Sequence, residues 1–115
     1  MFESANQIIK KLIAGALTLN KYLSETDAET IDPSEYSLIQ LTQAGAAETR
    51  GLANGREGQI IILICTTYAA DIVVTPSALA PGTTITFNAD EDVWIGVFLT
   101  GEWHTLYLGG SAAIA

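Results

Sequence analysis

Residues 93–108 read VWIGVFLTGEWHTLYL and carry the strongest local indication of the fold class. Two runs rich in β-favouring residues flank the tetrad Thr-Gly-Glu-Trp, in which Gly101 suits the first central position of a type II′ hairpin turn. Such a turn places Leu99 opposite His104. The sequence therefore predicts an antiparallel hairpin close to the end of the chain.

Both faces of this hairpin are apolar over most of their length. One face carries mainly aliphatic side chains, and the other carries the aromatic residues Trp94, Phe98, Trp103 and Tyr107. A sheet face that meets water normally carries polar residues. We therefore predict that the aromatic face contacts another subunit; a central position of the hairpin within its own sheet is the alternative.

The sequence upstream of the hairpin continues the β pattern. Residues 60–65, IIILIC, form the longest apolar run and predict a buried strand. Further short β-favouring segments lie between connections rich in Gly, Pro, Asn and Asp, at 17–22, 36–42, 71–75 and 83–88. We expect one mainly β domain over residues 18–115, a small antiparallel β-sandwich or barrel.

Residues 1–17 have a different pattern, in which apolar residues recur at helical spacing. The apolar stripe contains Ile8, Ile9, Leu12 and Ile13, and the opposite side carries Asn6, Gln7, Lys10 and Lys11. This spacing predicts a short amphipathic N-terminal helix; an extended arm that docks only in an assembly is the alternative. Because so short a helix is marginal by itself in water, we expect the stripe to contact a neighbouring subunit or an attachment surface.

The sequence predicts neither export nor membrane insertion. Lys10 and Lys11 interrupt the apolar part of the N-terminal segment, which is too short for the apolar region of a signal peptide. The longest apolar run is also far shorter than the roughly 18 residues that a membrane-spanning helix needs.

Composition excludes several classes of function. The 115 residues include 13 acidic and only 5 basic side chains, which gives a formal net charge of -8. So few cations cannot neutralise a row of phosphates or an anionic lipid surface, so we expect neither nucleic acid nor a membrane as a partner. With one histidine and one cysteine, the chain offers little for catalysis, and we predict that it is not an enzyme.

The residues that could carry chemistry all have structural interpretations that we favour. Cys65 ends the apolar run as a small core residue, and His104 fits a core or interface position better than a catalytic one. The carboxylates of residues 90–92 lack the spacing of a calcium loop and fit a solvated turn. The hairpin aromatics could form a sugar-stacking platform, although a core or subunit contact is favoured. We therefore predict no catalytic residue, metal ligand, cofactor or small-molecule substrate.

The C-terminal half contains a characteristic succession of short segments. The element Leu-x-x-Gly-x-Glu-Gly-Gln occupies residues 52–59 and leads directly into the apolar run. It is followed by DIVVTP at 71–76, GTTITF at 82–87, DVWIGVF at 92–98 and GEW at 101–103. This succession resembles a β-rich module of tailed-phage virion proteins, particularly head decoration (cement) proteins and fibre or tail modules.

The resemblance implies a non-enzymatic decoration protein that binds the assembled phage head as an oligomer, in this case a homotrimer, and stabilises it. Its partner would be the major capsid protein. Its location would be the capsid surface of the virion, and the host cytoplasm during assembly. A tail-fibre module that binds a receptor or glycan, with Trp94 and Trp103 exposed, is the alternative. In a decoration protein, residues 1–17 would attach the module to the shell or to a neighbouring subunit.

Overall fold

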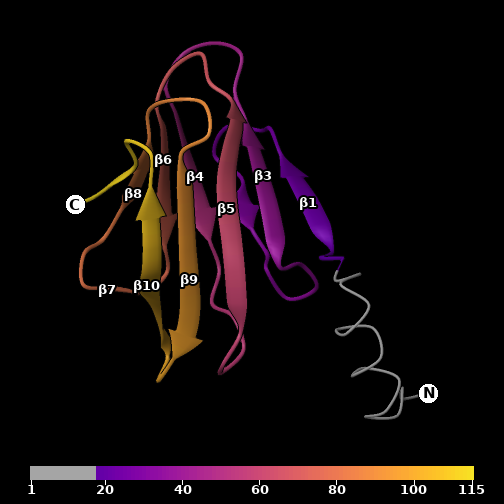
Figure 1. Cartoon of the computed structure of the whole chain (residues 1–115), viewed down its shortest axis with the longest axis vertical. Coiled ribbons are helices and arrows are strands. Elements are labelled where there is room, and N and C mark those ends of the chain that lie inside the picture. The colour runs from indigo at the N-terminus through magenta and orange to yellow at the C-terminus, as the bar shows by residue number, and fades with distance from the viewer. Residues whose placement is uncertain (1–17) are drawn as a thin grey trace.

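Residues 18–115, the part of the chain that this computed structural model describes, form eleven strands in two sheets that pack face to face (Figure 1). Sheet A contains, in spatial order, β1 (Lys21–Ser24), β3 (Leu38–Thr42), β5 (Ile60–Thr67), β9 (Val93–Leu99), β10 (Glu102–Gly109) and β7 (Leu79–Ala80). Sheet B contains β11 (Ala113–Ile114), β8 (Ile85–Phe87), β6 (Ile72–Pro76), β4 (Glu48–Leu52) and β2 (Thr30–Ile31). The predicted N-terminal helix or arm, residues 1–17, lies outside the described residues.

The mainly β prediction is confirmed, but the prediction of an antiparallel arrangement is wrong for the first half of the chain. From β1 to β6 the chain alternates between the sheets, so that β1, β3 and β5 pair in parallel in sheet A. The strands β2, β4 and β6 do the same in sheet B. Each visit to the other sheet is the crossover that returns the chain in its original direction. The result is a solenoid-like stack, which short alternating strands in the sequence do not distinguish from an antiparallel sandwich.

The second half of the domain is largely antiparallel. The strand β9 inserts between β5 and β10, and β8 pairs with β6 and β11. The predicted hairpin of β9 and β10 is confirmed, but its predicted register is wrong, because Leu99 pairs with Glu102 rather than with His104. The turn consists of Thr100 and Gly101, whose φ angles of 52° and 80° fit a type I′ turn.

A contact outside the hairpin accounts for this register. Both carboxylate oxygens of Glu57 accept the backbone N–H of Thr100, at 2.8 and 3.0 Å. The backbone N–H of Gly58 also donates to the carbonyl oxygen of Phe98, at 2.7 Å. The loop before β5 therefore holds the hairpin tip, and local turn preferences alone do not decide the pairing.

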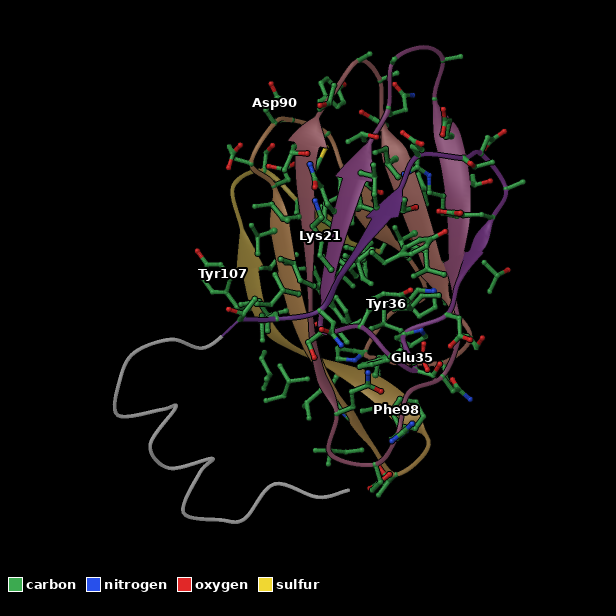
Figure 2. All side chains as sticks on the ribbon, turned by 90° about the vertical axis from the view of Figure 1, so that its right-hand side faces the viewer. Lys21, Glu35, Tyr36, Asp90, Phe98 and Tyr107 are labelled. Carbon is green, nitrogen blue, oxygen red and sulfur yellow. The ribbon has the colours of Figure 1, made fainter. Side chains whose placement is uncertain are left out.

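One hydrophobic core fills the space between the two sheets (Figure 2). Sheet A contributes the inward-facing residues of its central strands, and sheet B contributes those of β2, β4, β6 and β8. The largest apolar ones are Ile31, Ile39, Leu41, Leu52, Ile61, Leu63, Ile72, Ile85, Phe87, Trp94 and Trp103. Cys65 is fully buried among them, as the sequence predicted for a small core residue. Alternation along each strand then sends the next residue to the opposite, outer face of its sheet.

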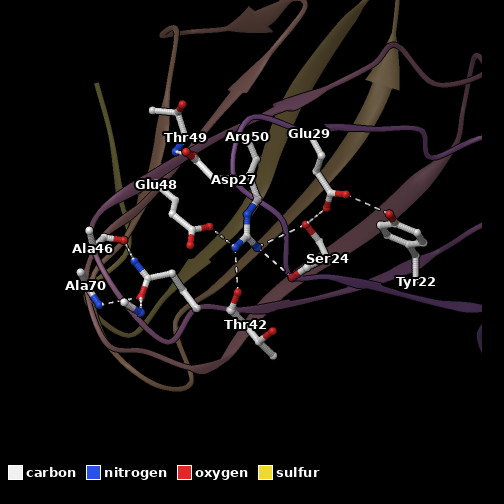
Figure 3. A network of polar contacts seen from close by, with 12 residues as sticks. Tyr22, Ser24, Asp27, Glu29, Thr42, Ala46, Glu48, Thr49, Arg50 and Ala70 are labelled. Atoms are coloured by element: carbon white, nitrogen blue, oxygen red, sulfur yellow. Dashed lines mark hydrogen bonds and ion pairs between the residues drawn. The ribbon is translucent and has the colours of Figure 1, made fainter.

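A buried arginine connects the two sheets at one end of this core (Figure 3). The Nη1 atom of Arg50 on β4 donates to the carbonyl and hydroxyl oxygens of Ser24, at 2.8 and 3.2 Å. Its Nη2 atom donates to the carbonyl oxygen of Thr42 and to the carboxylate of Glu48, both at 2.7 Å. The hydroxyl of Ser24 donates in turn to Glu29. These bonds join β1 and β3 of sheet A to β4 of sheet B, so the network is part of the fold.

Candidate interaction surface

The element at residues 52–59 is used to hold loops together. Gly55 lies against the indole of Trp103, where a Cβ atom would come within 2.8 Å of the ring. The Nε1 atom of the same indole donates to the carbonyl oxygen of Ala53, at 3.1 Å. The element therefore fastens the connection between β4 and β5 to the buried face of β10.

Two polar residues of this element form hydrogen bonds with other loops. The amide nitrogen of Gln59 donates to the carbonyl oxygen of Pro33 at 2.6 Å, and its amide oxygen accepts the backbone N–H of Arg56 at 3.0 Å. Glu57 holds the hairpin tip as described above. Gly55, Glu57 and Gln59 thus have structural roles in this chain.

The structure corrects three of the four interface residues predicted on the hairpin. Trp94, Phe98 and Trp103 are 0%, 6% and 0% exposed and pack edge to face inside the core, so they are not available to a partner. The hairpin is central rather than terminal in space: β5 and β7 flank it, and sheet B covers its aromatic face. The central position of the hairpin, the alternative to a subunit contact, is therefore the correct one.

Burial of the two tryptophans leaves no unpaired indole N–H. Trp94 donates to the hydroxyl oxygen of Thr105 at 2.9 Å, and Trp103 donates to Ala53. These hydrogen bonds offset the cost of removing the indole N–H groups from water, so both rings can be fully buried. Neither ring is exposed, so the sugar-stacking platform suggested by the sequence does not form.

Tyr107 has a different environment because a β-bulge precedes it. The register of β10 shifts between Thr105 and Tyr107, which leaves Leu106 as an extra residue and sets Tyr107 opposite Ile95. Tyr107 is 55% exposed and points away from the core on the outer side of sheet A (Figure 2). The bulge, which the sequence did not indicate, moves this ring from the inner to the outer face.

The outer face of sheet A is the main candidate for a functional surface. Strand pairing brings its outward-facing apolar residues side by side: Leu23, Leu38, Ile60, Ile62, Ile64, Val93, Ile95, Val97, Leu99 and Tyr107. The three central strands β3, β5 and β9 contain no charged residue on either face. This face is turned toward the viewer in Figure 1.

The opposite side of the molecule gives an internal comparison. The outer face of sheet B carries small and hydroxyl-bearing residues, among them Thr30, Thr49, Thr75 and Thr86. That is the composition expected of a sheet face that meets water. The same chain therefore has one polar sheet face and one apolar sheet face, and the apolar one requires an explanation.

The apolar face is about as large as the largest apolar patch of a typical soluble monomer, a patch that is often functional. The four strands β3, β5, β9 and β10 lie about 4.8 Å apart and are on average about seven residues long, so together they cover roughly 400 Å². Ile60, Leu106 and Tyr107 are 51%, 57% and 55% exposed within it or at its margin. Contiguous apolar patches of this extent on soluble proteins commonly mark a binding surface.

Charged groups are confined to the margins of this face. Lys21 at the β1 edge donates to the side-chain oxygen of Gln40 at 2.9 Å. On β10, the Nε2 atom of His104 lies 3.7 Å from a carboxylate oxygen of Glu102 and 3.2 Å from the carbonyl oxygen of Leu99. His104 is half-buried on the outer face of sheet A, beside the candidate surface.

The remaining candidates for chemistry are structural in the described residues. Burial, together with the nearby carboxylates of Asp90 and Asp92, raises the pKa of the Cys65 thiol to about 11, so the thiol stays protonated at neutral pH. Asp92 is buried and accepts the backbone N–H groups of Asn88 and Ser111, at 2.9 and 2.7 Å. Asp90 accepts the backbone N–H of Tyr68 at 2.6 Å. Within residues 18–115 no three potential metal ligands come together.

Comparison with known proteins adds no constraint. No model of a protein family matches the chain, and no curated protein is significantly similar to it in sequence. Among the described residues, no helix is both long and apolar enough to span a membrane.

Proposed function

We propose that this protein is a structural module of a phage virion, a decoration protein that binds the assembled head as a homotrimer and stabilises it. The observation that carries the proposal is the apolar outer face of sheet A, whose strands β3, β5 and β9 carry no charged residue, in a domain whose sheet B has a polar outer face. A face of this kind is stabilised by contact with another protein surface. The resemblance of residues 52–103 to virion modules supplies the expected setting.

The rest of the domain suits such a role. The loops at one end are tied together by Trp103, Gln59 and Glu57, which gives a rigid body rather than a flexible binding site. A rigid module that binds only the assembled lattice stabilises it by mass action. The formal charge of -8 keeps separate oligomers apart in solution.

The proposal is tested by locating the protein in the virions of the phage that encodes it. Heads and tails are separated, and mass spectrometry shows which fraction contains the protein. Purified protein is then titrated onto heads that lack it. We expect saturable co-sedimentation with heads and a higher temperature of head disruption. Absence from heads would overturn the proposal. Presence in tails together with glycan binding would establish the tail-fibre alternative.

A further inference from the structure

We propose that residues 1–17 of one copy cover the outer face of sheet A on a neighbouring copy. This inference rests on the oligomer proposed above but not on its attachment to a capsid. It assigns the apolar face to one occupant, the N-terminal segment of the same protein. It also joins two apolar surfaces that the sequence and the structure reveal separately.

The face and the segment match in character. The centre of the face consists of the outward-facing residues of β5 and β9, with Ile62 beside Ile95 at its middle. The segment carries an apolar stripe that includes Ile9 and Leu12, with Asn6, Gln7, Lys10 and Lys11 on its other side. Laid on the face, the stripe would exclude water from both surfaces and leave the polar side in solvent.

The lengths also match. A 17-residue helix would extend about 26 Å. The eight residues of β5 extend about 26 Å as well, at roughly 3.3 Å per residue. One helix is about 10 Å wide and so spans two adjacent strands, which are β5 and β9 here.

The place where the described chain begins favours a neighbouring copy over the same chain. The carbonyl oxygen of Asn20 accepts the backbone N–H groups of Ser37 and Leu38, both at 3.1 Å, which fixes Asn20 beside the β1–β3 edge of sheet A. The line between β5 and β9 lies about 12 Å further across the sheet, and a helix axis would lie about 10 Å above it. The steps from Leu17 to Asn20 span at most about 11 Å. A helix that ends at Leu17 therefore cannot lie along β5 and β9 over the centre of its own chain's face, the alignment in which the two lengths match.

Symmetry favours the same arrangement. Two sheet A faces packed on each other would form a two-fold contact, which closes with two copies. A homotrimer requires a head-to-tail contact between two different surfaces, repeated around a ring. The N-terminal segment and the outer face of sheet A are two such different surfaces.

The experiment uses two full-length variants, Ile9→Cys and Ile95→Cys, one of them isotope-labelled so that chains can be distinguished. The pools are mixed, equilibrated and oxidised mildly, and disulfides between different chains are counted by mass spectrometry. The buried thiol of Cys65 is common to all variants. We expect the Ile9→Cys and Ile95→Cys pair to link at least tenfold faster than Ile9→Cys with Thr75→Cys. Thr75 lies on the outer face of sheet B and is more exposed than Ile95, so the control does not lack access.

Equal linkage rates for the two pairs would overturn the proposal. So would a link that forms only within one chain carrying both Ile9→Cys and Ile95→Cys. Because the linkage is measured on the free protein, its success together with failed binding to heads would refute the capsid function alone.

A second measurement does not depend on disulfide formation. The double variant Ile9→Glu and Leu12→Glu places charge on the stripe, and Asn6→Glu with Gln7→Glu places the same charge on the opposite side. Once circular dichroism has shown that both are folded, the stripe variant is expected to bind a hydrophobic dye several-fold more strongly than the control. Equal dye binding would contradict the proposal.

Discussion

Gly55 lies where the loop before β5 passes against a buried indole. A Cβ atom there would come within 2.8 Å of the Trp103 ring and 2.7 Å of the side-chain oxygen of Gln59. Because Trp103 is packed on all sides, Gly55→Ala is expected to lower the free energy of unfolding by about 1–3 kcal/mol. Gly45→Ala, at a position with open space around it, should change it by less than about 0.5 kcal/mol. Urea denaturation of both variants measures this difference, and equal stabilities would contradict the role assigned to Gly55.

Because of the buried Cys65 thiol, the free energy of unfolding is expected to depend on pH in the alkaline range. Burial raises its pKa from 9.0 to about 11, so the unfolded thiol ionises first as the pH rises. The protonated thiol therefore contributes fully to the free energy of unfolding below pH 9. This contribution, about 2–3 kcal/mol, is lost as the pH rises from 9 to 11. The Cys65→Ala variant lacks this loss, so the stability advantage of the wild type over the variant should shrink across this range. Denaturation curves at several pH values test this, and a constant difference would contradict it.

Residue roles were only partly predictable from the sequence. The element at residues 52–59 stands out in the sequence, but nothing local indicates that its glycine meets Trp103, which lies 48 positions later. Trp94 and Trp103 were assigned to an interface because a hairpin that is apolar on both faces does not indicate which face meets the second sheet. The burial of Cys65 was predictable because it ends a run of five apolar, β-favouring residues.

Among the elements, the β9–β10 hairpin has a turn whose sequence does not suit its geometry. Thr100 adopts a φ of 52°, which is unfavourable for a β-branched residue, whereas type I′ turns favour Asn followed by Gly. Thr100→Asn should therefore raise the free energy of unfolding by about 0.5–1 kcal/mol, since the backbone N–H still donates to Glu57. Thr86→Asn, in the middle of a strand, should lower it. Thermal unfolding distinguishes the two, and a destabilised Thr100→Asn protein would contradict this interpretation.

Most of the longer strands were predictable, but β4 and the two-residue strands β2, β7 and β11 were not, and neither were the pairing partners of the strands. Alternating and β-branched runs locate the main strands, because those properties are local. Strand direction depends on which sheet the intervening segment visits, and the short strands β2 and β4 give no sequence signal of that choice. The bulge at Leu106, which exposes Tyr107, is equally invisible in the sequence.

For the whole molecule, the difference between the two outer faces is the feature with the largest consequence. Sheet A offers an apolar surface and sheet B a threonine-rich one. A head-to-tail contact that buries the first and leaves the second in water gives a ring of copies with the outer faces of sheet B exposed.

The most direct test is the mass of the protein in solution at micromolar concentration, measured by sedimentation for the wild type, Ile95→Glu and Thr75→Glu. Both substitutions add one negative charge to the outer face of a sheet, but only Ile95 lies on the apolar one. Ile60→Glu, at a more exposed position of the same face, serves as a second variant if Ile95→Glu is unstable. We expect a trimer for the wild type and for Thr75→Glu, and a monomer for Ile95→Glu. A monomeric wild type, or a trimer that Ile95→Glu and Ile60→Glu leave intact, would show that the outer face of sheet A is not the surface through which this protein assembles.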